Sequence, residues 1–132
     1  MQGESTRWNL DPETTLIRLL ALHAKARGNA VAVREKDLGI WQETTWAQWL
    51  DEVLACAAGL DALGFVRDSG LVAIGDNRLH LYSGNIAAAT LCGQAMPVYP
   101  DATPDEILHV IEQAGAAFVL AEDQEQVDKI LD

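Results

Sequence analysis

The fold is decided by the stretch Leu71-Val72-Ala73-Ile74-Gly75-Asp76-Asn77-Arg78, which lies near the middle of a 132-residue chain. Its first four residues are all apolar, the pattern of a strand that is covered on both faces of a parallel sheet. A turn at Gly75 follows, and a helical pattern then runs from Leu79 to Leu91. We therefore predict a strand–turn–helix unit, with residues 75–78 at the carboxyl end of a buried strand, where open α/β sheets bind their ligands.

The same alternation continues toward the C-terminus. We predict strands from Ala95 to Tyr99 and from Ala117 to Leu120, a helix between them, and a last helix after the second of these strands. Pro97 cannot donate a hydrogen bond to a sheet, so its strand is expected at a sheet edge or at a bulge. Short links between alternating strands and helices imply right-handed crossovers and a parallel sheet. The helix that begins at Leu79 is expected to end at Gly93. The next helix is expected to begin at the capping signal Thr103-Pro104-Asp105-Glu106 and to end at Gly115, and Asp123 is expected to cap the last helix.

Toward the N-terminus the pattern predicts a helix, a β-hairpin and a second helix. The first helix is expected to begin at Asp11-Pro12-Glu13 and to end at Gly28. The hairpin strands are expected from Ala30 to Arg34 and from Ile40 to Thr44. The second helix begins with a capping box, Thr45-Trp46-Ala47-Gln48, and ends with a Schellman motif at Gly64 and Phe65. The predicted class is α/β: an N-terminal helix and β-hairpin, then a β-α-β-α-β-α unit, in one domain, 1–132.

Composition and charge narrow the range of partners. The formal net charge is −11, which argues against a nucleic-acid or anionic-lipid binder. Between Asp101 and Asp132 there are nine acidic residues and one basic residue, Lys129; this acidic face is either simply solvated or a docking surface. The N-terminus has no signal-peptide pattern and no apolar run is long enough to span a bilayer, so a cytoplasmic protein is expected. Cys56 and Cys92 are expected to be buried helix thiols and form neither a zinc site nor a disulfide.

No complete active site is found in the sequence. The glycine pairs with phosphate-loop spacing lack the lysine that such loops require. Asp76 or Asn77 is predicted to cap the following helix, and a ligand-facing or interdomain role for the 75–78 turn is the alternative. The three histidines have no nucleophile placed beside them, and the tryptophan group is expected to serve core or interdomain packing. These residues are His23, His80 and His109, and Trp41, Trp46 and Trp49.

Several segments together resemble a known enzyme family. They are residues 34–42, which read Arg-Glu-Lys-Asp-Leu-Gly-Ile-Trp-Gln, residues 45–50, residues 72–78, residues 97–100, and residues 121–129. In this order they resemble the N-terminal part of long-chain acyl-CoA synthetases, members of the adenylate-forming, AMP-binding superfamily. The likeness extends from Thr15 to Leu131. One departure is Leu79-His80-Leu81, where many relatives have Pro-Glu-Trp.

The resemblance implies an enzyme that uses ATP and magnesium to form an acyl-adenylate from a fatty acid and then transfers the acyl group to coenzyme A. The family's phosphate loop and its other defining motifs lie downstream of this segment. No catalytic, cofactor-binding or metal-binding residue is therefore assigned, and none of these cofactors is expected to bind the segment alone. The chain is expected to be an incomplete N-terminal portion of the large AMP-binding domain, inactive by itself and prone to self-association, whose partner is the rest of its own enzyme.

Two other classes remain open at the level of sequence. One is a free-standing flavodoxin-like module that binds a nucleotide or a protein. The other is a non-catalytic interaction domain that uses the acidic face. For the full enzyme, peripheral association with a membrane is an alternative to a purely cytoplasmic location.

Overall fold

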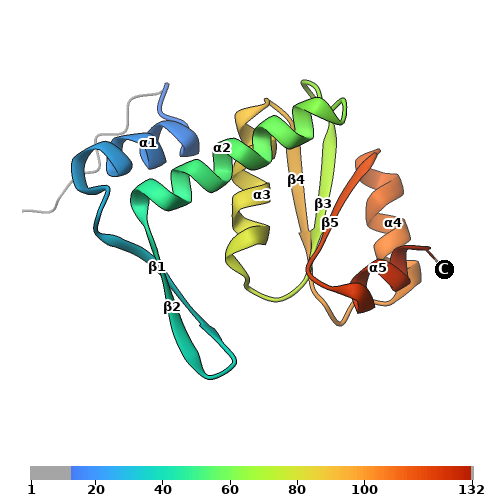
Figure 1. Ribbon diagram of the computed structural model, residues 1–132. Helices are drawn as coiled ribbons and strands as arrows, with labels where there is room; N and C mark the ends of the chain where they lie inside the picture. The colour runs from blue at the N-terminus through green and yellow to red at the C-terminus, as the bar shows by residue number, and fades with distance from the viewer. Residues whose placement is uncertain (1–12, 132) are drawn as a thin grey trace, which may run out of the picture.

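A computed structural model describes residues 13–131 and shows a mixed α/β fold (Figure 1). A helix and a β-hairpin come first, and a three-stranded parallel sheet with its helices follows, as the sequence predicts. The elements in chain order are α1 (Leu16–Arg27), β1 (Val31–Asp37), β2 (Ile40–Thr45), α2 (Trp46–Ala62), β3 (Gly70–Ile74), α3 (Leu79–Thr90), β4 (Gln94–Val98), α4 (Pro104–Ala114), β5 (Phe118–Ala121) and α5 (Gln124–Leu131).

The order of strands in the parallel sheet is β4-β3-β5. All five residues of β3 are buried, which explains why its sequence is uninterruptedly apolar. Among residues 13–131, β4 pairs with β3 alone and carries Pro97, so the prediction that this strand lies at a sheet edge is confirmed. Helices α2 and α3 lie on one side of the sheet, and α4 and α5 lie on the other (Figure 1).

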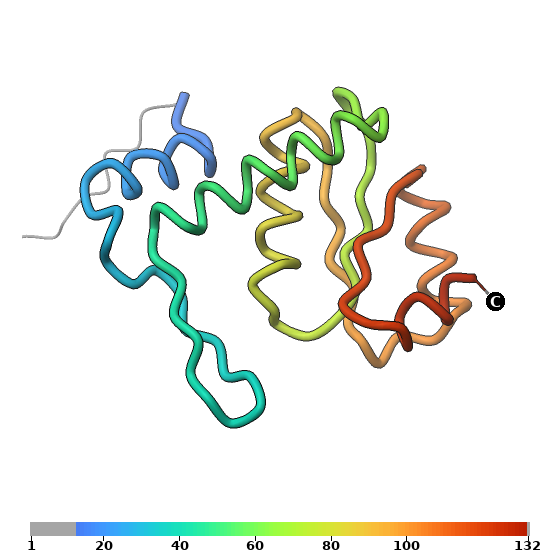
Figure 2. Tube along the Cα trace, in the orientation of Figure 1, coloured from blue at the N-terminus to red at the C-terminus, as the bar shows by residue number. Residues whose placement is uncertain are grey.

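The β1–β2 hairpin extends away from the parallel sheet (Figure 2). Its strands are longer than the sequence suggested, because pairing continues to Asp37 and Ile40. Leu38 and Gly39 form the turn, and both have positive φ, 46° and 82°. A two-residue turn of this kind matches the right-handed twist of the strands, so a long connecting loop is not needed.

Two clusters of buried side chains form the core. One joins the first three helices through Leu20, Val53 and Ala87, together with Ala57. The other packs the sheet against α3 through Phe65, Leu71 and Ala88. Leu60 and Leu91 contact both clusters. The helical layer and the parallel sheet are therefore one continuous core.

The predicted helix caps are confirmed at several ends. The capping boxes at Thr45 and Thr103 each show both of their hydrogen bonds, and Asp123 accepts from the Gln126 N–H at 3.1 Å. The Phe65 N–H donates to the Leu60 carbonyl, the bond that defines a Schellman ending. These motifs depend on residues at most five positions apart, so they can be predicted from local sequence.

Three local predictions need correction. Helix α1 begins at Leu16 with Thr15 as its N-cap, so the start expected at Asp11-Pro12-Glu13 is too early; Asp11 and Pro12 lie outside the described residues. Cys56 is only partly buried, and Cys92 is exposed. The sequence predicted that Gly93 ends α3, but the residue with the left-handed conformation after this helix is Cys92, with φ 59°.

Gly93 is needed beside Cys92 for a different reason. A Cβ atom at Gly93 would overlap the ring of Phe65, which is 1 % exposed, and would come within 2.7 Å of the Ser69 carbonyl oxygen. The end of α3 therefore uses Cys92 for the reversal of the chain and Gly93 for close contact with the core.

Candidate functional site

The candidate site is the turn at residues 75–78, where β3 ends at the carboxyl edge of the sheet. Gly75 has φ +150°, a conformation that L-residues rarely adopt. A Cβ atom at this position would lie 2.7 Å from Glu122 Oε2. Because Glu122 directly follows β5, the two adjacent strands deliver the turn and this carboxylate to one place.

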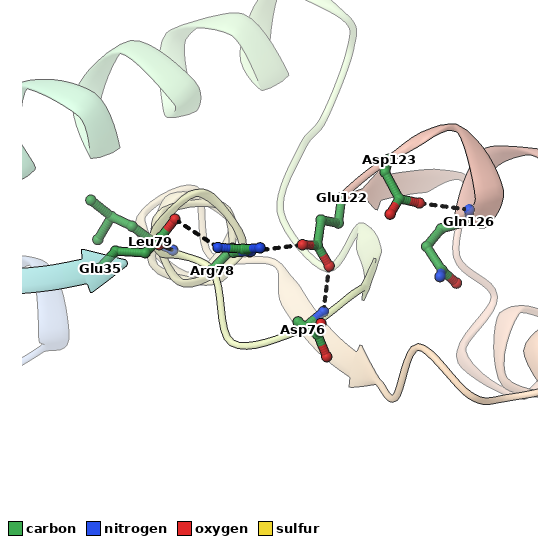
Figure 3. Close-up of polar contacts among 7 residues, drawn as sticks. All are labelled: Glu35, Asp76, Arg78, Leu79, Glu122, Asp123 and Gln126. Carbon is green, nitrogen blue, oxygen red and sulfur yellow. Dashed lines mark hydrogen bonds and ion pairs between the residues drawn. The ribbon is translucent and has the colours of Figure 1, made fainter. Parts of the chain in front are cut away.

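Glu122 binds the turn through both of its carboxylate oxygens (Figure 3). Oε2 accepts from the Asp76 N–H at 2.6 Å, and Oε1 accepts from Arg78 Nε at 2.8 Å. The Glu122 side chain is only 16 % exposed. The pKa of the Glu122 carboxyl is lowered below its ordinary value, mainly by the hydrogen bond from the Asp76 N–H and secondly by the hydrogen bond from the Arg78 guanidinium. Glu122 is therefore held as a carboxylate by its two donors.

A second carboxylate reaches the turn from the hairpin. Glu35 of β1 accepts from the Leu79 N–H at 2.8 Å, which caps the first residue of α3. Its other oxygen lies 3.4 Å from Arg78 Nη1 (Figure 3). Carboxylates stabilise a helix N-terminus because the N–H groups there are unsatisfied and the helix dipole is positive. Arg78 thus bridges two carboxylates that approach from opposite parts of the chain.

The prediction that Asp76 or Asn77 caps α3 is wrong. Arg78 stands at the N-cap position and makes no side-chain capping bond. The Asn77 side-chain oxygen Oδ1 instead accepts from the Tyr82 hydroxyl at 3.1 Å. Sequence reasoning did not single out Glu35 or Glu122 for any role, because neither lies within the one-turn spacing of a local cap. The sequence offered one indication of a role for Glu35 and Glu122, which is that each follows a predicted strand.

The arrangement also limits what this edge can bind. In doubly wound sheets an anion binds the N–H groups of the loop and the helix N-terminus beside the central strand. Here the Asp76 N–H and the Leu79 N–H are already donated to Glu122 and Glu35. The flavodoxin-like alternative would require these two carboxylates to move away. The geometry therefore favours a structural joint over a phosphate site.

Two openings flank the 75–78 turn and share Asn77 and Tyr82. One is a cavity of about 300 Å³ between the ends of β3 and β4 and helix α3. The other, of about 470 Å³, lies between the hairpin and the start of α3. Both are within the size range of small-molecule sites or of sites filled by a protein segment.

The other residues considered from the sequence lie apart from this edge or pack in the interior. His80 Nδ1 lies 2.9 Å from Glu52 Oε1, and the same carboxylate oxygen accepts a hydrogen bond from the Ser83 hydroxyl. Ser83 is only 1 % exposed, so a substrate cannot reach its hydroxyl and these three residues do not form a nucleophilic site. Within residues 13–131 no group of three or more His, Cys, Asp or Glu side chains could hold a metal ion. No described helix is both long and apolar enough to cross a membrane.

The aromatic side chains divide between the core and the surface. Trp46 and Trp49 pack against the helical core cluster, and Trp46 contacts the ring of His23 at 4.6 Å between centroids. Trp41 is 62 % exposed on the hairpin, where Lys36 lies 5.9 Å from its ring. His109 lies on α4 and is exposed. The expectation of core packing is thus confirmed for two of the three tryptophans.

Comparison with known proteins assigns the family. Residues 20–132 match the family described as AMP-binding enzyme. The chain belongs to the AMP-binding enzyme family. This confirms the resemblance carried by the segments from residue 34 to residue 129, and it places the 75–78 turn within an adenylate-forming enzyme fold.

Two curated relatives match most of this chain. A long-chain-fatty-acid–CoA ligase of Xenopus laevis is 24 % identical over 120 residues, which are 91 % of this chain and 16 % of the ligase. An uncharacterized protein of Mycobacterium tuberculosis is 28 % identical over 117 residues, 89 % of this chain and 65 % of that protein. The chain thus spans a small part of the first relative and somewhat less than two thirds of the second.

Solved structures show the same fold. VinN, solved in complex with L-aspartate, has a TM-score of 0.81 and 27 % identity over 90 % of this chain and 32 % of its own. The N-terminal domain of FACL13 from Mycobacterium tuberculosis has a TM-score of 0.79 and 20 % identity over 86 % of this chain and 28 % of its own. A fatty acid AMP ligase from Legionella pneumophila has a TM-score of 0.74 at 19 % identity, over 81 % of this chain and 19 % of its own.

Proposed function

We propose that residues 1–132 are the N-terminal portion of the large domain of an adenylate-forming ligase. The observation that carries the proposal is the family match over residues 20–132. The enzyme would use ATP to convert a carboxylic acid into an acyl-adenylate. The likeness to a long-chain-fatty-acid–CoA ligase supports a fatty acid as the substrate and coenzyme A as the acyl acceptor.

The acid itself is the part of the proposal that most needs a test. Among the structural neighbours, VinN was solved with L-aspartate and with 3-methylaspartate, whereas another neighbour is a fatty acid AMP ligase. ATP, magnesium and coenzyme A belong to the proposed activity of the longer enzyme. We assign none of them to a residue of this chain. The Asp76 and Leu79 N–H groups at the 75–78 turn are bonded to Glu122 and Glu35, and the glycine pairs with phosphate-loop spacing lack the lysine that such loops require.

Within such an enzyme the described residues would act as a scaffold. The 75–78 turn joins the hairpin, helix α3 and the end of β5 through Glu35, Arg78 and Glu122. A rigid joint at the carboxyl edge would hold this part of the large domain in a fixed position against the segments that carry the chemistry.

The test is acid-dependent exchange of pyrophosphate into ATP, measured with the longest polypeptide encoded in frame with this chain. Palmitate and aspartate are compared as substrates, and the 132-residue chain alone is the control. We expect exchange with palmitate by the longer protein and none by the chain alone. A reading frame that closes directly after Asp132, or a longer protein that activates no acid, would overturn the proposal. Exchange with aspartate but not palmitate would overturn the fatty-acid assignment alone.

A further inference from the structure

The joint at residues 75–78 is held from two sides that differ in how firmly they are fixed. Glu122 follows β5, a strand of the parallel sheet, and its side chain is 16 % exposed. Glu35 belongs to β1, whose hairpin extends away from that sheet (Figure 2), and its side chain is 28 % exposed. The parallel sheet therefore fixes the Glu122 side of the joint, whereas the Glu35 side depends on how the hairpin is attached.

Packing does little to hold the hairpin in place. No residue from 33 to 44 is buried, and none belongs to either core cluster. The large apolar side chains near the turn, Leu38, Ile40 and Trp41, are all more than 60 % exposed. Between the hairpin and the start of α3 lies the cavity of about 470 Å³. Segments with few buried apolar contacts open at low cost, so the hairpin needs another attachment to keep its position.

Polar contacts between the hairpin and the rest of the chain converge on one side chain. Apart from the main-chain bonds of the β1–β2 ladder, every hydrogen bond and ion pair that joins residues 33–44 to another part of residues 13–131 is made by Glu35. The other ion pair of the hairpin, between Arg34 and Glu43, lies within it. Glu35 is thus the single polar attachment of the described hairpin beyond its base.

The base of the hairpin has the features of a hinge. Main-chain bonds from the first two residues of α2 fix the base to the carbonyl groups of residues 28 and 30. The register of the two strands then shifts between Val31 and Val33, so that Ala32 is an extra residue in β1. A β-bulge of this kind interrupts the ladder and bends the strand. The hairpin can therefore change direction at Ala32 while the pairs beyond it stay intact.

We propose that the β1–β2 hairpin is a hinged arm that closes on α3, and that the Glu35 carboxylate is its catch. In the closed position, which the structure shows, Glu35 accepts from the Leu79 N–H at 2.8 Å and lies 3.4 Å from Arg78 Nη1. In the open position α3 loses its N-terminal cap, Arg78 keeps only Glu122, and the cavity between hairpin and helix opens. The position of the hairpin and the order of the first turn of α3 are thereby coupled, whether or not the proposed ligase activity holds.

Amide residual dipolar couplings of the isotopically labelled 132-residue chain test the proposal, because they report the orientation of the hairpin relative to the sheet. The variants are Glu35→Ala, which removes the catch, and Glu43→Ala, which removes a carboxylate that pairs with Arg34 inside the hairpin. In the wild type we expect residues 33–44 and strands β3, β4 and β5 to fit one alignment. In Glu35→Ala the couplings of residues 33–44 should shrink and no longer fit it, whereas Glu43→Ala should behave like the wild type.

Hydrogen exchange at the start of α3 measures the other half of the coupling. The Leu79 amide should exchange about tenfold faster in Glu35→Ala than in the wild type, because it loses a charged acceptor. Glu35→Gln keeps an oxygen that can accept from this N–H but loses the charge that faces Arg78, so it should give an intermediate rate. Amides of β3, which pairs with a strand on each side, are the internal reference and should be unchanged in both variants.

Cross-strand contacts distinguish an arm that swings from a hairpin that unfolds. The contact between Lys36 and Trp41 should persist in Glu35→Ala, because these residues pair within the hairpin. Four results would overturn the proposal: wild-type couplings of the hairpin in Glu35→Ala, averaged couplings already in the wild type, loss of the Lys36–Trp41 contact in Glu35→Ala, or an equal effect of Glu43→Ala.

Discussion

Arg78 is the residue on which the carboxyl edge of the sheet depends. Its guanidinium lies between Glu35, 43 positions earlier, and Glu122, 44 positions later. The Arg78 side chain is 38 % exposed, so the value of each ion pair is reduced by solvent. The contribution of Glu122 is greater than that of an ordinary surface pair, because it also accepts a main-chain hydrogen bond from Asp76.

Glu122→Gln tests this residue through the pH dependence of stability. The pKa of Glu122 is lower in the folded protein than its ordinary value of 4.5, so the folded state binds this proton less readily than the unfolded state. The stabilisation is therefore complete above about pH 4.5 and is lost as the pH falls through the lower folded pKa. At pH 7 the variant should lose about 1.5 kcal/mol, the low end of the usual value of hydrogen bonds to charged groups, because the Gln oxygen can still accept one of them.

Urea unfolding of the wild type and of Glu122→Gln between pH 2 and pH 7 measures the effect. The difference between the two proteins should shrink as the pH falls. Glu112→Gln, at an exposed position of α4, is the control and should have little effect. A constant difference across the whole range would contradict the role of the ionised carboxylate.

At the scale of elements, α2 connects the helical core to the sheet. Leu60 contacts both core clusters, and its carbonyl accepts from the Phe65 N–H at the Schellman ending. Leu63 lies at the end of the same helix and is 74 % exposed. The two leucines are three positions apart, Leu60 in the last turn of α2 and Leu63 at its C-cap, and they differ in burial.

Leu60→Ala should lower the free energy of unfolding by about 2 kcal/mol, the low end for core leucines, because Leu60 is only partly buried. Leu63→Ala should change it by less than about 0.5 kcal/mol. Denaturant unfolding of both variants measures the difference. If both variants lowered the free energy of unfolding equally, α2 would not pack against the core through the face that contains Leu60.

At the scale of the whole molecule, much apolar surface lies outside the two core clusters. Leu63, Val66, Tyr99 and Leu131 are each more than 60 % exposed. β5 is an edge strand of the parallel sheet and contains no charged residue or proline that would hinder pairing with another strand. Both features are typical of surfaces that another protein segment covers.

We therefore expect the isolated chain to self-associate and to bind the dye ANS. Size-exclusion chromatography over a range of concentrations should show a shift toward larger species. A longer polypeptide that contains the chain, run in parallel, should bind less dye per molecule. A sharp monomer that binds no dye and melts cooperatively would contradict this prediction and favour a free-standing module.

Sequence reasoning predicted most of the fold because the signals it uses are local. The run of apolar residues at β3 identified the buried strand, Pro97 identified the edge strand, and the capping boxes at Thr45 and Thr103 identified two helix starts. Each signal depends on residues within one turn or one strand, where backbone geometry alone relates sequence to structure.

The candidate site depended on tertiary structure. Asp76 and Asn77 have the right chemistry to cap α3, yet Glu35 caps it from a hairpin 44 positions earlier in the chain. Likewise, only pairing of β5 with β3 brings Glu122 to the Asp76 N–H. Whether a nearby side chain or a distant carboxylate caps α3 depends on where the hairpin and β5 lie in the fold. The spacing of residues along the sequence does not reveal those positions. The sequence by itself determined the elements and their order; the meeting of β1, α3 and β5 at one edge decided which side chains form the site.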